Sequence, residues 1–169
     1  MTGGSKLRAL ATLAALVVCV AGTGPAAAQG TNLTFSGLNA VRGQPVEVRS
    51  DSLQVDNSTG QTTFSGNAVL GQGDMRLAAQ TITVIYTPGN SARIRRLEAS
   101  GGVTLVTAVE AAEAASAVYD IDAGTVLMSG SVILTQGPNV LSGDRLTVNL
   151  RNGRGSLEGR VRTIIQTDR

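Results

Sequence analysis

The sequence contains no histidine and no tryptophan, and only one cysteine, Cys19, in 169 residues. Without an imidazole, the chain cannot build a His-ligated zinc site, a Ser-His-Asp triad or a Cys-His dyad. It has two phenylalanines and two tyrosines, which are too few for the aromatic platform that stacks on single-stranded nucleic acid. These absences argue against an enzyme, and we expect no cofactor and no metal.

Short catalytic and cofactor motifs are missing as well. The chain has no G-x-S-x-G elbow and no phosphate loop ending in G-K-[ST]. The pair Gly71 and Gly73 lacks the third glycine of a dinucleotide fingerprint. Asp120 and Asp122 resemble the start of a calcium loop, but a third oxygen ligand and a closing glutamate are absent. Two acids flanking a hairpin turn are the more ordinary interpretation.

The first 28 residues have the composition of a secretory signal peptide. Lys6 and Arg8 precede an apolar run over residues 10–21, and Ala26 to Ala28 supply the small residues that signal peptidase accepts. Removal of residues 1–28 would leave 12 basic and 12 acidic residues, because Lys6 and Arg8 are two of the 14 basic ones. We therefore expect an exported protein without cysteine and with a net charge near zero. Retention of the segment as a membrane anchor stays an alternative.

Four glycines mark a repeat in the remaining chain. Gly66, Gly101, Gly130 and Gly159 each follow a serine or glutamate and precede a run of apolar residues, with separations of 35, 29 and 29 residues. A period of this length is typical of stacked supersecondary units. Each unit alternates apolar and polar residues on both sides of a turn, which predicts a β-hairpin. A glycine inside a strand usually marks a bulge or bend, so four of them predict a sheet folded over at a corner.

The alternation also predicts which side chains share one face, because successive residues of a strand point to opposite sides. We interpret the apolar face as the wall of a ligand-binding groove, although an ordinary closed core would show the same pattern. The predicted wall consists of Leu53, Val55, Phe64, Leu70, Ile82, Val84, Tyr86, Val103, Leu105, Tyr119, Met128, Val132, Leu134, Leu146, Val148 and Leu150.

One segment conflicts with the repeat. Residues 108–117 read AVEAAEAASA, a composition that favours a helix by intrinsic propensity. Their position between two strand units favours a turn followed by an edge strand. We follow the repeat and expect the edge strand.

Three stretches resemble the OstA-like, LptA-type periplasmic lipopolysaccharide transport proteins: PVEVRSDSLQVD at 45–56, FSGNAVLGQG at 64–73 and LTQGPNVLSGDRLTVNL at 134–150. The resemblance implies an all-β, antiparallel β-jellyroll over residues 45–165, folded like an open taco around an apolar interior. A flexible segment at 29–44 would precede it and a short tail at 166–169 would follow. The alanine-rich stretch departs from the family pattern.

The resemblance also implies a function in the periplasm. Such proteins shield the acyl chains of lipid A and associate head to tail, and they bridge an LptC-like inner-membrane protein to an LptD-like outer-membrane protein. Two other classes stay open from the residues alone. One is a structural β-repeat module, and the other is a chaperone for an outer-membrane component.

Charged and edge residues complete the candidate sites. Arg93, Arg95 and Arg96 are candidates for contacts to lipid A phosphates, because the guanidinium fork matches a phosphate; a solvated strand and loop is the alternative. The first and last strands leave unpaired backbone groups at the ends of the stack, and such edges are templates for another strand. The predicted assembly edges contain Val46, Val48, Val161, Thr163 and Ile165.

Overall fold

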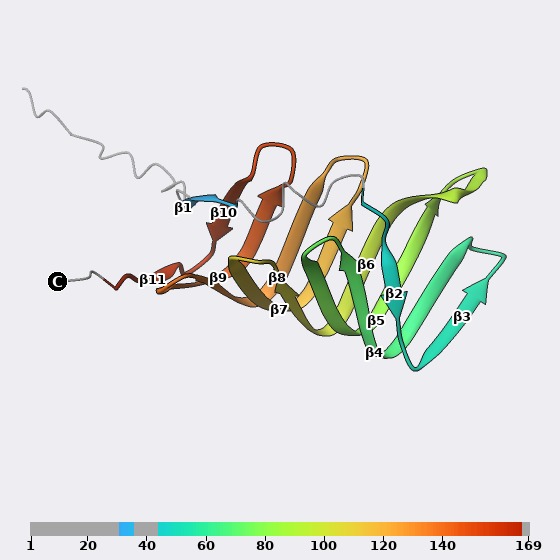
Figure 1. Cartoon of the computed structure of the whole chain (residues 1–169), viewed down its shortest axis with the longest axis horizontal. Helices are drawn as coiled ribbons and strands as arrows, with labels where there is room; N and C mark the ends of the chain where they lie inside the picture. The colour runs from blue at the N-terminus through green and yellow to red at the C-terminus, as the bar shows by residue number, and fades with distance from the viewer. Residues whose placement is uncertain (1–30, 36–43, 167–169) are drawn as a thin grey trace, which may run out of the picture.

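The structure, a computed structural model, describes residues 31–35 and 44–166, apart from the side chains of residues 31, 32, 91 and 92. These residues form one antiparallel sheet of eleven strands without a helix, so the all-β expectation is confirmed (Figure 1). In the described part of the chain, no helix is long and apolar enough to cross a membrane. The predicted signal peptide and the last three residues lie outside the described residues. The strands are β1 (Thr31–Thr34), β2 (Glu47–Arg49), β3 (Ser52–Asp56), β4 (Gln61–Gln72), β5 (Met75–Thr87), β6 (Asn90–Val106), β7 (Glu110–Asp120), β8 (Thr125–Gln136), β9 (Asn139–Asn149), β10 (Arg154–Glu158) and β11 (Arg162–Ile164).

The predicted hairpins are present, and tight turns join them. Gly60, Gly89, Gly124 and Gly153 lie in these turns with φ between 65° and 75°. This left-handed region costs residues with a Cβ about 1–2 kcal/mol, whereas glycine adopts it freely. The turn glycines therefore fix where each hairpin reverses.

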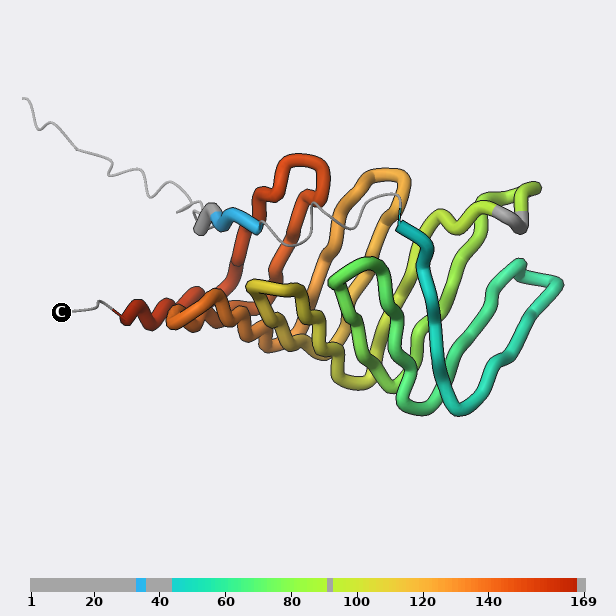
Figure 2. Tube along the Cα trace, in the orientation of Figure 1, coloured from blue at the N-terminus to red at the C-terminus, as the bar shows by residue number. Residues whose placement is uncertain are grey.

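The sheet bends at the four glycines of the repeat. Gly66, Gly101, Gly130 and Gly159 have φ from 77° to 89°, and the residue after each of them also has a positive φ. The strand register shifts at the first three of these points. Each bend uses two residues, so the inward phase of the strand is the same on both sides of it. Figure 2 shows the bends along the lower side of the molecule.

A second property makes glycine necessary at these corners. A Cβ built on Gly66, Gly101, Gly130 or Gly159 would lie 2.5–2.6 Å from a side-chain atom of the residue beside it on the neighbouring strand or connection. Those residues are, in the same order, Asp51, Gln80, Ala115 and Asp144. The stacked corners therefore exclude side chains by space as well as by backbone conformation.

The corners divide the sheet into two facing layers. Each of β4 to β9 crosses a corner and contributes one half to each layer. Layer A contains β1, β3, β10 and the halves of β4 to β9 on their side of the corners. Layer B contains β2, β11 and the other halves. The layers are continuous at the corners and separate along the opposite side, which we name the seam. The hairpin turns lie along this seam, so the expectation of a folded, taco-like roll is confirmed.

Two sequence expectations need correction. Within the segment 29–44, expected to be flexible, Thr31–Thr34 form β1 and pair with β10. The alanine-rich stretch is a strand, as the repeat favoured, but β7 lies between β6 and β8 and is not an edge. Small side chains suit this central position, because Ala112 and Ala117 are buried between the layers.

Candidate functional site

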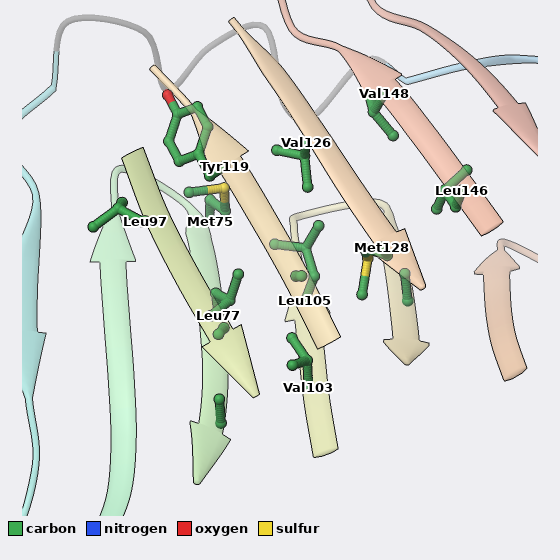
Figure 3. Packing of buried hydrophobic residues seen from close by; sticks show 14 of the residues in the cluster. Met75, Leu77, Leu97, Val103, Leu105, Tyr119, Val126, Met128, Leu146 and Val148 are labelled. Atoms are coloured by element: carbon green, nitrogen blue, oxygen red, sulfur yellow. The ribbon is translucent and has the colours of Figure 1, made fainter. Parts of the chain in front are cut away.

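A continuous apolar surface lies between the two layers in the described part of the chain. In layer B, one inward row crosses the sheet from Val48 through Leu70, Leu77, Leu105, Ala112, Leu134 and Leu141. Facing side chains of layer A include Leu97, Tyr119, Val126, Leu146 and Val148, and Figure 3 shows them together with Leu77 and Leu105 of the layer B row. Strands are about 4.8 Å apart, so the seven strands of this row span about 29 Å. That length exceeds the roughly 15 Å that one acyl chain spans in half of a bilayer.

Most residues of the predicted wall lie on the inward face of the roll. Twelve of the sixteen residues are buried in the core: Leu70, Ile82, Val84, Val103, Leu105, Tyr119, Met128, Val132, Leu134, Leu146, Val148 and Leu150. Phe64 and Tyr86 are partly buried against this core. The structure contains no ligand, so the binding role of these residues stays a prediction.

Leu53 and Val55 depart from the expected burial. Their side chains are 59% and 58% exposed. Each pairs with an inward-facing residue, Phe64 or Thr62, so the predicted face is correct. The reason for the exposure is position, because β3 is the last strand of layer A and nothing lies beyond it. The interior is therefore uncovered at this end of the roll.

Several core residues were not predicted from the sequence. Met75 and Leu77 lie in the first half of β5, Leu141 lies in the first half of β9, and Phe35 follows β1. The first three belong to half-strands of about five residues next to a turn, a length over which alternation is hard to recognise. Phe35 is one of four aromatic residues, and that scarcity is the only sequence signal that it carries.

A cleft of about 610 Å³ opens at the β3 end of the roll. It lies between the β3–β4 and β5–β6 hairpins and is lined by Val55, Thr62, Tyr86 and Arg95, together with residues of both turns. In Figure 1 these two hairpins project at the right side of the sheet. The cleft combines apolar side chains of the inner face with a polar rim.

The three candidate arginines occupy different surroundings. Arg93 donates to Asp122 Oδ1 at 2.6 Å, and Arg96 donates to Glu98 Oε1 at 3.3 Å. Arg95 lines the cleft. The structure therefore brings one of the three to the cleft and places the other two in ion pairs. Their role as phosphate contacts stays a prediction.

Carboxylates stabilise the first and last corners. Asn67 donates to Asp51 Oδ2 at 2.8 Å, and Arg160 donates to Asp144 Oδ1 at 2.8 Å. The hydrogen bond from Arg160, together with its positive charge, lowers the pKa of Asp144. The same pairing raises the pKa of Arg160. Asp56, the last residue of β3, accepts hydrogen bonds from Ser58 and Thr59, which lower its pKa to about 2.

The two predicted assembly edges lie at opposite ends of layer B. Val46 and Val48 are partly buried beside β4, whereas Val161, Thr163 and Ile165 are exposed in and around β11. Layer A ends in β3 on one side and in β1 on the other. Each end of the roll therefore presents two strand edges. The predicted edges correspond to β2 at one end and β11 at the other. Their use in assembly stays a prediction.

The chemistry of this arrangement is apolar. Within residues 31–35 and 44–166, no group of three or more Asp, Glu, His or Cys side chains is placed to hold a metal ion. What the site offers is a long aliphatic surface between two hinged layers, open at one end. A two-layer antiparallel roll with such an interior belongs structurally to the β-jellyroll class.

Comparisons with known proteins identify the family. A family model described as LptA/(LptD N-terminal domain) LPS transport protein matches residues 47–154. An uncharacterised protein of Rhizobium meliloti (strain 1021) is 32% identical over 153 residues, covering 85% of this chain and 81% of that protein. The crystal structure of LptH from Pseudomonas aeruginosa, the LptA-homologous periplasmic component of its lipopolysaccharide transport device, matches with a TM-score of 0.67 at 17% identity. That match covers 75% of this chain and 99% of that one, and it supports the fold. The chain belongs to the family of LptA and LptD N-terminal domain lipopolysaccharide transport proteins.

Proposed function

We propose that the protein carries lipopolysaccharide through the periplasm by shielding lipid A acyl chains between layers A and B. The observation that carries this proposal is the continuous inward row of aliphatic residues from β2 to β9, combined with family membership. The protein acts without catalysis and reaches the periplasm by a cleaved signal at residues 1–28. LptH, whose fold it shares, is a periplasmic component of such a device.

The energetics suit a carrier. Burying an acyl chain contributes about 0.8 kcal/mol for each methylene, so about ten methylenes contribute about 8 kcal/mol before ordering costs. Aliphatic walls provide this stabilisation without directional bonds. The ligand therefore has no fixed register along the row, which allows it to move from strand to strand.

A polar headgroup needs a place outside the apolar interior. Arg95 lies in the cleft at the β3 end, where the inner face is exposed. A guanidinium there pairs with a phosphate while the acyl chains enter between the layers. Arg93 and Arg96 would have to leave Asp122 and Glu98 to make the same contact.

The ends of the roll suit head-to-tail contacts. β2 and β3 at one end and β11 and β1 at the other have free strand edges. Strand addition across these edges would keep the apolar rows continuous from one protomer to the next. In this arrangement the same edges meet an LptC-like protein of the inner membrane and an LptD-like protein of the outer membrane.

Site-specific photo-crosslinking in cells tests the proposal. A photoreactive residue at Val84, Leu105, Val132 or Val148 should crosslink to lipopolysaccharide, because these side chains face inward. The matched controls are Thr83, Thr104 and Thr147, which precede or follow inward residues and point outward. Equal crosslinking from the inward and outward sets would contradict lipid binding between the layers.

A further inference from the structure

The roll is closed unequally along its length. At the β3 end, Leu53 and Val55 are exposed and the cleft is open. Inward residues are already buried in β4 and β5, and Ile82, Met128 and Leu157 have no exposed surface. An acyl chain that travels the full row must therefore enter a region that is already filled by the protein.

Phe35 fills part of that region. It is 2% exposed and lines a small cavity together with four apolar residues and two buried polar ones. The apolar residues are Leu105, Ala112 and Leu134 of layer B and Leu146 of layer A, and the polar ones are Thr107 and Glu110. The space left among these residues is about 10 Å³. A single aromatic ring thus occupies the position between the layers that a segment of acyl chain would need.

The backbone around Phe35 crosses the seam. β1 extends layer A by pairing with β10, and Phe35 N–H donates to Gly153 O. From layer B, Gln136 Nε2 donates to the carbonyl oxygen of Thr34 at 3.1 Å. Residues 31–35 therefore connect both layers on the side where they are otherwise separate. Figure 1 shows β1 beside the upper end of β10.

A glycine on β10 makes room for the ring. A Cβ built on Gly155 would overlap the Phe35 ring, since it would lie closest to Cε2. Gly155 is in the interior of a strand, where glycine weakens pairing and usually allows a close approach. Its presence is explained by the ring that lies on it.

The attachment of this segment is short. β1 has four residues, forms one edge of the sheet and pairs with β10 alone. Terminal segments with few contacts open at a lower free energy than the rest of a fold. We therefore expect residues 31–35 to detach at a lower free energy than β2 to β11 open.

From these observations we propose that residues 31–35 form an internal strap, in which Phe35 occupies an acyl-chain position until lipid displaces it. The strap closes the β7–β10 half of the groove when the protein is empty and keeps its apolar surface from water. This inference rests on the proposed function and adds a gate to it. Lipid binding and strap release are then coupled, because the lipid and Phe35 compete for the same position.

The first test measures lipid A affinity of the purified protein. Removing a competing plug raises the apparent affinity by a factor equal to the reciprocal of the fraction of time that the site is free of the plug. We expect Phe35→Ala to bind lipid A about tenfold more tightly or better, from the burial lost by one aromatic side chain. The comparison variant is Phe64→Ala, which removes the other phenylalanine, a predicted wall residue at the open end, and should weaken binding.

Two further variants keep the test decisive if Phe35→Ala destabilises the fold. The chain has no tryptophan, so Phe35→Trp places a unique fluorophore in the strap, and its emission should shift to the red when lipid A is added. A disulfide between Thr34→Cys and Gln136→Cys should pin the strap to layer B. Oxidation should then block lipid A, and reduction of the same protein should restore binding.

The outcomes separate the strap from the proposed function. Unchanged affinity in Phe35→Ala and in the oxidised pair, with unchanged tryptophan emission, would overturn the strap and leave lipid binding intact. An equal gain in lipid A affinity for Phe64→Ala would mean that a general loosening of the fold causes the effect, and this result would also overturn the strap. If no form binds lipid A, including Phe35→Ala and the reduced pair, both the strap and the proposed function are wrong.

Discussion

At the scale of single residues, the corner glycines carry two constraints that can be separated by mutation. Gly130 has φ 89°, and a Cβ there would lie 2.6 Å from that of Ala115. Gly137 has φ 55° and nothing near its Cβ position. Both positions penalise a side chain through the backbone, but only Gly130 adds a collision with the neighbouring strand.

We predict that Gly130→Ala lowers the free energy of unfolding by about 2–5 kcal/mol, from left-handed backbone strain and overpacking. Gly137→Ala should lower it by about 1–2 kcal/mol, from the backbone term alone. Urea unfolding of both variants measures the difference. Equal losses would mean that the contact with Ala115 relaxes freely and that space is not a constraint at the corners.

The carboxylate at the last corner makes stability depend on pH. The pKa of Asp144 is lowered in the fold by the hydrogen bond and charge of Arg160. A lowered pKa stabilises the fold above the unfolded value, which is about 3.9, and this contribution is lost as the pH falls through the folded value. Asp56, with a pKa of about 2, acts in the same direction.

We therefore predict that Asp144→Asn reduces the loss of stability between about pH 5 and pH 2, relative to the unmodified protein. Denaturant titrations across this range provide the measurement. Arg160→Asn is the matched control, because it copies the first corner, where Asn67 donates to Asp51. It should retain the corner at neutral pH and weaken the acid dependence. An Asp144→Asn protein with the original slope would assign the acid sensitivity to other carboxylates.

At the scale of elements, β7 tests how far intrinsic propensity can be overruled. Its sequence favours a helix, yet it pairs along its length with β6 and β8. Glu113 lies on its exposed side, between Thr104 and Ile133 of the neighbouring strands. Sheet pairing, not propensity, decides the conformation of this segment.

We predict that Glu113→Thr raises the free energy of unfolding by about 0.5–1 kcal/mol, because a β-branched residue suits a strand and packs between two others. Glu113→Ala should give no gain, since it adds neither branching nor contact. Thermal unfolding of the two variants is the measurement. A loss for Glu113→Thr with a gain for Glu113→Ala is the pattern of a helix and would contradict the strand.

The elements also show what can be predicted from the sequence and what cannot. The hairpins and corners were predictable because turn glycines and the Gly66, Gly101, Gly130 and Gly159 repeat act locally. Strand β1 could not be predicted, because its four residues carry no turn signal and their partners in β10 are more than 100 residues away in the sequence. The inward phase of Leu53 and Val55 was predictable, but their exposure depends on where the sheet ends. For the same reason the sequence could not place Phe35 between the layers.

At the scale of the whole molecule, the two ends of the roll differ, and this determines how copies can join. One end presents β2 and β3 with the exposed Leu53 and Val55, and the other presents β11 with the exposed Ile164 and Ile165. A contact between unlike ends is heterologous and extends into a filament, whereas a contact between like ends closes as a dimer.

Backbone pairing at β11 is part of the contact between unlike ends, so Thr163→Pro or Ile165→Pro should weaken assembly while leaving the fold largely intact.

Mixing variants that block one end each gives the sharpest prediction. We expect Leu53→Glu and Ile164→Glu to stay folded, because both side chains are exposed (59% and 51%). Each variant alone should be monomeric, since every contact needs both kinds of end. An equimolar mixture should form heterodimers and nothing larger, because one compatible pair of ends is left. Sedimentation velocity resolves these species. If either variant alone still forms dimers, copies join through like ends, and a head-to-tail bridge between the membranes is the wrong model.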